Sequence, residues 1–171
     1  MISLCFLEEL LVKNRVLAVF PRLAPEWIVS FTIRLTSVTA SKGFCNILHM
    51  TQNGNMEEYG DRTPAVLLKR EKGGSTYTEF LINSGINGLT SYVQARPPVP
   101  EINFLTRIEI HQRYESQDKY RVFVKINGEE IQHSTINTDA RLFNKVKVYI
   151  SDPWFDTCSG YIKNLVITNF T

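Results

Sequence analysis

Apolar and polar side chains alternate strictly along the segment EWIVSFTIRLTS, residues 26–37. Every second position is apolar and large: Trp27, Val29, Phe31, Ile33 and Leu35. Successive side chains of a β-strand point to opposite faces of a sheet, whereas an α-helix repeats every 3.6 residues. The alternation covers ten residues, about twice the length of an average strand. The segment therefore predicts a long strand with one buried face.

The same two-residue period recurs along the chain. In KYRVFVKING the apolar face holds Tyr120, Val122, Val124 and Ile126, and Asn127-Gly128 follows directly. Asn-Gly between alternating segments is a strong signal for a tight hairpin turn, so residues 129–136 are predicted to return as the partner strand. Turn-rich pieces separate the further strand candidates, which are residues 15–20, 44–51, 64–70, 76–83, 89–95, 103–112, 146–151 and 161–168.

About ten long strands with one solvated face each predict an all-β fold. Two antiparallel sheets packed face to face, a β-sandwich or jelly roll, account for this pattern best, and a closed barrel is the alternative. The length of 171 residues suits one domain, which we place at residues 15–171. Residues 1–14 are predicted to form an N-terminal extension, with a short helix over about residues 4–13.

Charge and the N-terminal segment limit the partners. The net charge is +2, from 19 basic and 17 acidic side chains spread along the chain, which gives no basic field for nucleic acid or an anionic membrane. The segment MISLCFLEELLVKN contains Glu8 and Glu9, resembles a signal peptide poorly and is too short to span a membrane. A sequon, Asn169-Phe170-Thr171, is favoured as a chance match, since glycosylation there requires secretion.

The three cysteines form no metal or redox motif. Cys5, Cys45 and Cys158 contain no CxxC pair, so neither a zinc ribbon nor a thioredoxin-like site is indicated. An odd number also argues against a complete disulfide framework. We favour three reduced and mostly buried thiols, because a free cysteine behaves as a small apolar side chain. A single bridge between Cys45 and Cys158 is the alternative.

The sequence favours a protein without catalytic activity. A glycosidase needs two carboxyl groups that flank the scissile bond, and no predicted strand carries two carboxylates on one face. Glu109 and His111 share a face, but no further carboxylate joins them there. The three histidines, His49, His111 and His133, lack the spacing of metal ligands. Sheet-face histidines without a catalytic role are therefore expected.

The segment HMTQNGNMEEYGDRTPAV, residues 49–66, holds the first group of binding candidates. Asn53, Tyr59, Asp61 and Arg62 lie in its loop, between two predicted strands. Oxygen-rich side chains on a turn suit a calcium ion, although the spacing is not that of an EF-hand. Turn chemistry and a local ion pair between Asp61 and Arg62 explain the same residues without a ligand.

The segment VKVYISDPWFDTCSGYIKNL, residues 146–165, holds the second group. Asp152-Pro153 is a turn initiator, because aspartate oxygens accept backbone N–H bonds there, and the turn places Trp154 at the rim of the sandwich. A rim indole can stack on a sugar, or it can close the end of the core. The structural role is favoured, and Trp154 is kept as a binding candidate.

Five segments resemble concanavalin A-like lectin/glucanase domains, above all laminin G-like modules: EWIVSFTIRL, ILHMT, YGDRTPAV, YRVFVKINGEEI and VKVYISDPW with GYIKNLVI. The resemblance covers roughly residues 15–168. It implies a jelly roll, usually extracellular, that binds glycans or proteins, in some cases through calcium. The glucanase pattern E-x-D-x-x-E and the galectin pattern H-x-N-x-R are both absent. Laminin G-type calcium sites use acidic rim residues, for which Asp61, Asp152 and Asp156 are the candidates.

These observations predict a non-catalytic binding module of the lectin or laminin G kind. A glycan is expected at a loop-rimmed face, bound by Asn53, Tyr59, Asp61, Arg62 and Trp154, with calcium as the one cofactor to test. The alternative is an extracellular protein-interaction or matrix-assembly module, with exposed Ile28, Phe123 and Tyr149 forming one apolar patch. A diverged glycosidase requires two carboxylates about 5–10 Å apart in a cleft.

Overall fold

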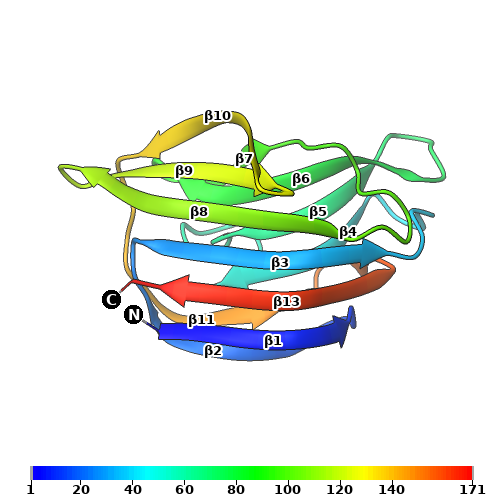
Figure 1. Cartoon of the computed structure of the whole chain (residues 1–171), viewed down its shortest axis with the longest axis horizontal. Coiled ribbons are helices and arrows are strands. Elements are labelled where there is room, and N and C mark those ends of the chain that lie inside the picture. Colours follow the sequence, from blue (N-terminus) through cyan, green and yellow to red (C-terminus); the bar gives the residue numbers. More distant parts are fainter. Residues whose placement is uncertain (1, 171) are drawn as a thin grey trace.

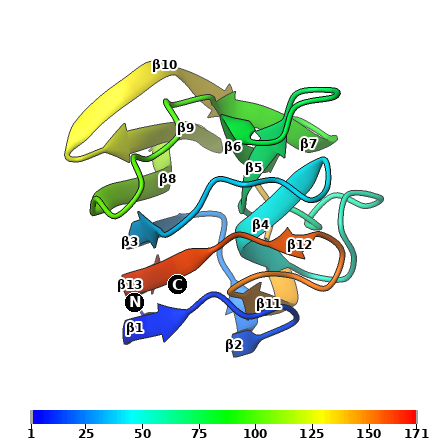
Figure 2. The same cartoon turned by 90° about the vertical axis from the view of Figure 1, so that its right-hand side faces the viewer.

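Two antiparallel β-sheets pack face to face in the computed structural model, which describes the backbone of residues 2–170 and the side chains of residues 7–170. Figure 1 looks onto one sheet, and Figure 2 shows both layers end-on. The predicted two-sheet sandwich is confirmed, and the barrel is not formed because both sheets stay open. The described residues include no helix of the length and apolarity needed to cross a membrane.

One sheet has six strands and the other has seven. The six-stranded sheet has the order β1 (Ile2–Leu10), β13 (Gly160–Asn169), β3 (Trp27–Leu35), β8 (Thr106–Ser116), β9 (Lys119–Ile126) and β10 (Glu129–Asn137). The other sheet has the order β2 (Val16–Leu23), β11 (Phe143–Tyr149), β4 (Phe44–Thr51), β5 (Ala65–Arg70), β6 (Tyr77–Ile86) and β7 (Leu89–Ala95). The two-residue strand β12 (Asp156–Thr157) runs parallel to β4 beside β11.

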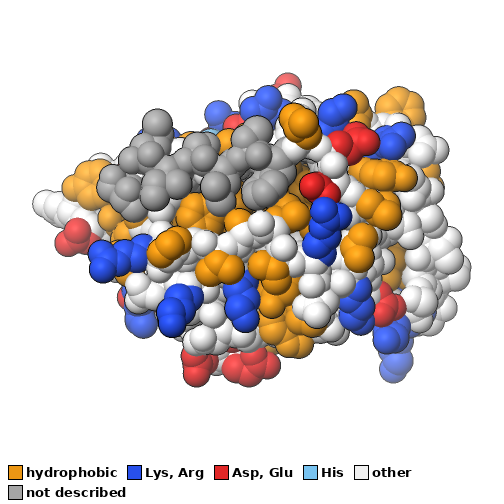
Figure 3. All heavy atoms as spheres, turned by 90° about the horizontal axis from the view of Figure 1, so that it is seen from below, with side chains coloured by type: hydrophobic (Ala, Val, Ile, Leu, Met, Phe, Trp, Pro, Cys, Tyr) orange, Lys and Arg blue, Asp and Glu red, His pale blue; other side chains and the backbone are white. Residues whose placement is uncertain are grey.

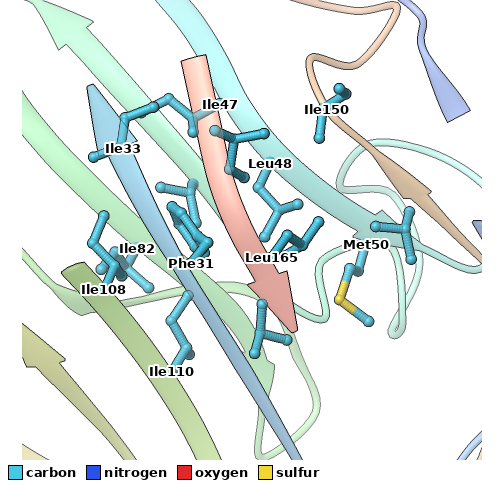
Figure 4. Packing of buried hydrophobic residues seen from close by; sticks show 14 of the residues in the cluster. Phe31, Ile33, Ile47, Leu48, Met50, Ile82, Ile108, Ile110, Ile150 and Leu165 are labelled. Carbon is cyan, nitrogen blue, oxygen red and sulfur yellow. The ribbon is translucent and has the colours of Figure 1, made fainter. Parts of the chain in front are cut away.

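The inner faces of the sheets form one apolar core. Every second residue of β3 is buried, as its alternation predicts, and Phe31 meets side chains from both layers (Figure 4). Burial of one large apolar side chain contributes about 1.5–3 kcal/mol. The labelled core residues are Phe31, Ile33, Ile108, Ile110 and Leu165 from the six-stranded side, and Ile47, Leu48, Met50, Ile82 and Ile150 from the other.

The helix expected over residues 4–13 is wrong, because Ile2–Leu10 form strand β1. This strand pairs with β13 along its whole length, from Ile2 opposite Asn169 to Leu10 opposite Tyr161. An unpaired edge of β13 would expose a row of backbone N–H and C=O groups, and β1 satisfies them. Sheet pairing therefore overrides the weak local preference for a helix.

The expectation of three reduced thiols is also wrong for two of the cysteines. Cys45 of β4 and Cys158 form a disulfide across 113 residues of sequence. The parallel pairing of Asp156 with Cys45 brings the two segments together. The side chain of Cys5 lies outside the described residues. The bridge fastens the segment after β12 to the middle of the seven-stranded sheet.

Apolar side chains are exposed along the edge formed by β1 and β2. Figure 3 shows this edge of the molecule, with hydrophobic side chains gathered on it. The exposed fractions reach 80% for Leu7 and 51% for Val19; the group, here called the β1–β2 edge patch, also contains Leu10, Val12 and Val16. The patch lies where an outermost strand of each sheet meets the other.

The apolar patch predicted from Ile28, Phe123 and Tyr149 does not form. Ile28 and Phe123 flank His111 on the outer face of the six-stranded sheet, in one cross-strand row. Tyr149 belongs to the other sheet and is buried there. Alternation assigned each residue to the outside of its own strand, but it carries no information about which sheet that strand joins.

The sequon asparagine is a structural residue. Asn169 is fully buried, its Nδ2 donates to the carbonyl oxygen of Arg22 at 2.8 Å, and its Oδ1 accepts from the N–H of Ala24 at 2.8 Å. A glycan would have to be attached to this same Nδ2. The folded chain therefore uses Asn169 to fasten the β2–β3 connection.

Candidate functional site

Two connections meet on the outer side of the seven-stranded sheet. The first is the β4–β5 loop, residues 52–64, and the second is the β11–β12 corner, residues 150–155 (Figure 2). The corner leaves the sheet after Tyr149 pairs with His49, and it returns where Asp156 pairs with Cys45. The corner therefore lies beside the part of β4 between Cys45 and His49.

His49 of β4 joins the loop to the corner. Its ring is fully buried, with Nδ1 2.7 Å from Asp152 Oδ2 and Nε2 2.6 Å from the carbonyl oxygen of Asp61. A carbonyl oxygen only accepts, so Nε2 carries a proton. Nδ1 lies opposite Asp152 Oδ2, and the two groups are joined by one hydrogen bond. His49 and Asp152 thus form a buried hydrogen-bonded pair.

Asp61 organises its own loop. Its Oδ1 accepts the N–H of Gly54 at 2.7 Å, and its Oδ2 accepts the N–H groups of Glu57 and Glu58 at 2.9 Å each. Three backbone donors on one buried carboxylate fix the turn in a single conformation. The carboxylate therefore points into the loop, and the Asp61 carbonyl is the group that reaches His49.

Asp152 has the same role in the corner. Its Oδ1 accepts the N–H groups of Trp154 at 3.0 Å and Phe155 at 2.9 Å, while its own N–H donates to Asn46 Oδ1 at 2.9 Å. The turn predicted at Asp152-Pro153 is confirmed. Both carboxylate oxygens have partners, since Oδ2 is hydrogen-bonded to His49.

Arg62 is buried with only 5% of its surface exposed. Its Nε and Nη2 donate to the carbonyl and Oδ1 of Asn55, at 3.1 and 3.0 Å, and its Nη1 donates to Ser91 Oγ at 2.7 Å. These bonds go to neutral groups rather than to the neighbouring Asp61. Burial lowers the pKa of Arg62, and the charges of Asp152, Glu57 and Asp61 act in the opposite direction.

Trp154 stands at the surface of this cluster. Its side chain is 40% exposed, and its ring lies 5.3 Å from the His49 ring and 6.0 Å, edge-on, from the Tyr149 ring. The adjacent Phe155 packs against Phe44 at 5.5 Å. The two roles considered for Trp154 therefore coexist: one side of the indole packs on buried groups, and the rest faces solvent. We call the exposed ring with its base of His49 and Tyr149 the Trp154 platform.

The structure gathers Asp61, Arg62, Asp152 and Trp154 around His49, but other candidates lie apart. The Tyr59 hydroxyl donates to the carbonyl of Asp139 at 2.8 Å, the Arg141 guanidinium lies 4.7 Å above its ring, and burial raises the pKa of Tyr59. Tyr59 thus fastens the β4–β5 loop to the β10–β11 connection.

Asn53 and Asp156 also have local partners. Asn53 Nδ2 donates to Glu58 Oε2 at 3.2 Å within the same loop. Asp156 accepts from Ser41 Oγ at 2.7 Å and lies 3.3 Å from Lys42 Nζ; hydrogen bonds from both lower the pKa of Asp156.

The three aspartates do not fit a shared calcium site. In the part of the chain that the structure describes, no group of three His, Cys, Asp or Glu side chains is placed to hold a metal ion. Asp61 and Asp152 direct their oxygens at backbone N–H groups and His49, and Asp156 directs its oxygens at Ser41 and Lys42. Calcium binding by the chain is an untested prediction.

Sequence reasoning missed His49, which was expected to be an ordinary sheet-face histidine. His49 and Asp61 are only 12 residues apart, on either side of a single loop, and this short separation was the one local signal for their contact. Asp152 lies 103 residues away, so no local pattern connects it to His49. Only the pairing of β11 with β4 brings them together.

Comparisons with known proteins match the structure but not the sequence. No protein-family description matches the chain, and no curated protein does. A heptameric SAP-like pentraxin from Limulus polyphemus superposes with a TM-score of 0.61 at 11% identity, over 96% of this chain and 77% of that one. The alginate lyase Aly36B superposes with a TM-score of 0.55 at 14% identity, over 95% of this chain and 80% of that one.

A third similar structure is domain 4 of AbnA, an extracellular arabinanase of Geobacillus stearothermophilus, in complex with arabinotriose. Its TM-score is 0.53 at 15% identity, over 88% of this chain, which spans only 65% of that chain's length. At such identities the likeness shows the fold alone. The fold is a concanavalin A-like jelly roll.

Proposed function

We propose that this protein is a non-catalytic carbohydrate-binding module and that the Trp154 platform is its binding site. The supporting observation is a tryptophan that is 40% exposed yet held from below by His49 and Tyr149. A rigid, partly open indole offers an apolar face to a sugar ring at low entropic cost.

A binding role fits the state of the nearby carboxylates. Hydrolysis of a glycoside requires one carboxyl group to deliver a proton and a second to act as nucleophile or base. Asp61 and Asp152 are buried and engaged with N–H donors, so neither presents oxygen atoms to a ligand beside Trp154. This arrangement favours recognition over chemistry at the platform.

The test is a glycan array followed by calorimetry on any glycan retained, with and without calcium. We expect Trp154→Ala to weaken binding at least tenfold and Trp154→Phe to weaken it less, because a smaller aromatic face remains. Tyr114→Ala is the matched control, since Tyr114 is 54% exposed at the far end of β8. Retention of full affinity by Trp154→Ala, or the absence of any bound glycan, would contradict the proposal.

A second candidate function rests on the β1–β2 edge patch. Five large aliphatic side chains, each more than 40% exposed, lie on or between β1 and β2, which are outermost strands of the two sheets. Clusters of this kind mark protein-interaction surfaces. If the chain binds a protein there, Val19→Lys should abolish the association seen by light scattering or pull-down with a matrix extract, while Trp154→Ala should leave it unchanged.

We also infer that the protein works in an oxidising, extracellular compartment. Disulfides persist there and are rare in the reducing cytosol, and the chain forms one between Cys45 and Cys158. Thiol counting by mass spectrometry on protein isolated from its native source would find both cysteines protected from alkylation. Alkylation of both would contradict the inference.

A further inference from the structure

The outer face of the six-stranded sheet contains a cavity far from the Trp154 platform. It has a volume of about 130 Å³ and is lined by Ser30, Phe31, Thr32, Arg107, Asn164 and Val166, from strands β3, β8 and β13. Its origin is a β-bulge: the register between β13 and β3 shifts between Lys163 and Val166, and Asn164 has a φ of 51°. A bulge bends its strand and opens the ladder locally. We call this space the bulge cavity.

The lining of the bulge cavity is mainly polar. Ser30 and Thr32 contribute hydroxyl groups from one face of β3, and Asn164 contributes a side-chain amide. Within the described part of the chain, these three side chains make no hydrogen bond to another residue. Donors that lack protein partners in a half-enclosed space bind water or a ligand oxygen.

Arg107 supplies a charge at the mouth. Its side chain is 61% exposed, and one of its five N–H groups, Nε–H, donates to Glu109 Oε1 at 3.0 Å. The terminal Nη groups are therefore available to a second acceptor. A guanidinium with free donors binds carboxylate or sulfate oxygens in a planar, two-bond geometry.

The surroundings of the cavity carry more positive than negative charge. Lys163 precedes the bulge, and Arg34 follows Thr32 by two positions on β3. With Arg107 these make three cations, against the carboxylates of Glu109 and of Glu8, whose Oε2 lies 3.8 Å from Lys163 Nζ. The local field thus favours an anion although the whole chain is nearly neutral.

We propose that the bulge cavity binds a small oxyanion, a sulfate or carboxylate group. Arg107 pairs with its charge, and the Ser30 and Thr32 hydroxyls and the Asn164 amide donate to its oxygens. The cavity holds only about four waters at ~30 Å³ each, which suits a charged group and not a whole sugar ring. The anion is free in solution or is the acidic substituent of a glycan whose ring stays outside the cavity.

The experiment is an NMR titration of the full chain with sodium sulfate against sodium chloride at equal ionic strength. We expect saturable shifts of the Ser30, Thr32 and Asn164 amides with sulfate alone. Arg107→Ala should weaken the binding at least tenfold. Arg113→Ala is the control, because Arg113 lies on the same face of β8 but is paired with Glu26 at 2.7 Å and does not line the cavity.

A second variant, which should strengthen sulfate binding instead of weakening it, makes the test stricter. Glu109→Gln removes the carboxylate that competes for Arg107 and should tighten sulfate binding.

Parallel titrations with glucuronate and a monosaccharide sulfate identify the source of the anion. Tighter binding of either compound than of inorganic sulfate indicates a glycan, and tighter binding of inorganic sulfate indicates a free anion. Shifts that do not saturate, that appear equally with chloride, or that survive Arg107→Ala overturn the proposal. Sulfate binding that persists in Trp154→Ala shows that this site does not depend on the proposed sugar site.

Discussion

At the scale of single residues, three buried polar side chains hold the candidate site together. Asp61 closes its loop, Asp152 closes its corner, and His49 bridges the two through one bond to each. Each carboxylate receives several donors, as a buried charge must to avoid a large desolvation cost. The position of Trp154 depends on this arrangement, because the Trp154 N–H is bound to Asp152 and its ring rests on His49.

His49→Ala should therefore be strongly destabilising. It removes the hydrogen-bond partner of the buried Asp152 carboxyl group and of the Asp61 carbonyl, and each buried group left without a partner costs about 1–3 kcal/mol. Urea unfolding measures the loss, and tryptophan fluorescence of the folded variant should shift because the base of the Trp154 ring is removed. His133→Ala, at an exposed position of β10, should change the stability by less than about 0.5 kcal/mol. Similar effects of both variants would rule out a structural role for the His49 hydrogen bonds.

At the scale of elements, local pattern predicted the strands well. The Asn127-Gly128 turn is confirmed: both residues have positive φ, 52° and 89°, and Ile126 pairs with Glu129 across it. The alternation of Val146–Tyr149 placed Tyr149 on the outer face of β11 correctly. It did not predict that Tyr149 would be buried, because the covering ring of Trp154 belongs to a corner with no periodic signal.

The β4–β5 loop also depends on Gly60, which precedes Asp61 in the turn that the sequence predicts. Gly60 has a φ of 106°, and a Cβ there would lie 2.7 Å from Cε1 of the Phe143 ring. Gly60→Ala should cost about 1–3 kcal/mol from the backbone alone, with the clash in addition. Gly73→Ala is the matched control, since its φ is 81° but a Cβ there meets nothing within 4 Å.

Thermal or urea unfolding of the two glycine variants separates the contributions. Gly60→Ala should lose more stability than Gly73→Ala, and Phe143→Leu should reduce the difference by making room for the added methyl group. Equal losses would show that the backbone conformation accounts for the whole effect and that the loop does not press on Phe143.

At the scale of the whole molecule, the two proposed sites lie on opposite faces of the sandwich and rest on different strands. The Trp154 platform depends on contacts between segments about 100 residues apart, so neither spacing nor periodicity could predict it. The fold class could be predicted because each strand carries its own burial pattern, but the order of strands within each sheet is set by pairing across the chain.

The Cys45–Cys158 bridge acts at this largest scale, because it closes a loop of 113 residues that contains most of the seven-stranded sheet. Cross-linking lowers the entropy of the unfolded chain, by an amount worth about 4–5 kcal/mol for a loop of this length in the chain-entropy model.

Reduction with dithiothreitol should therefore lower the free energy of unfolding by about 2–5 kcal/mol, measured in urea. The double variant Cys45→Ala/Cys158→Ala should be destabilised to a similar degree and should not respond to dithiothreitol. Because the bridge fastens the segment that follows the β11–β12 corner, its loss should also weaken any glycan binding that depends on Trp154. Unchanged stability in wild-type protein whose reduction is verified by mass would show that packing alone holds the corner to β4.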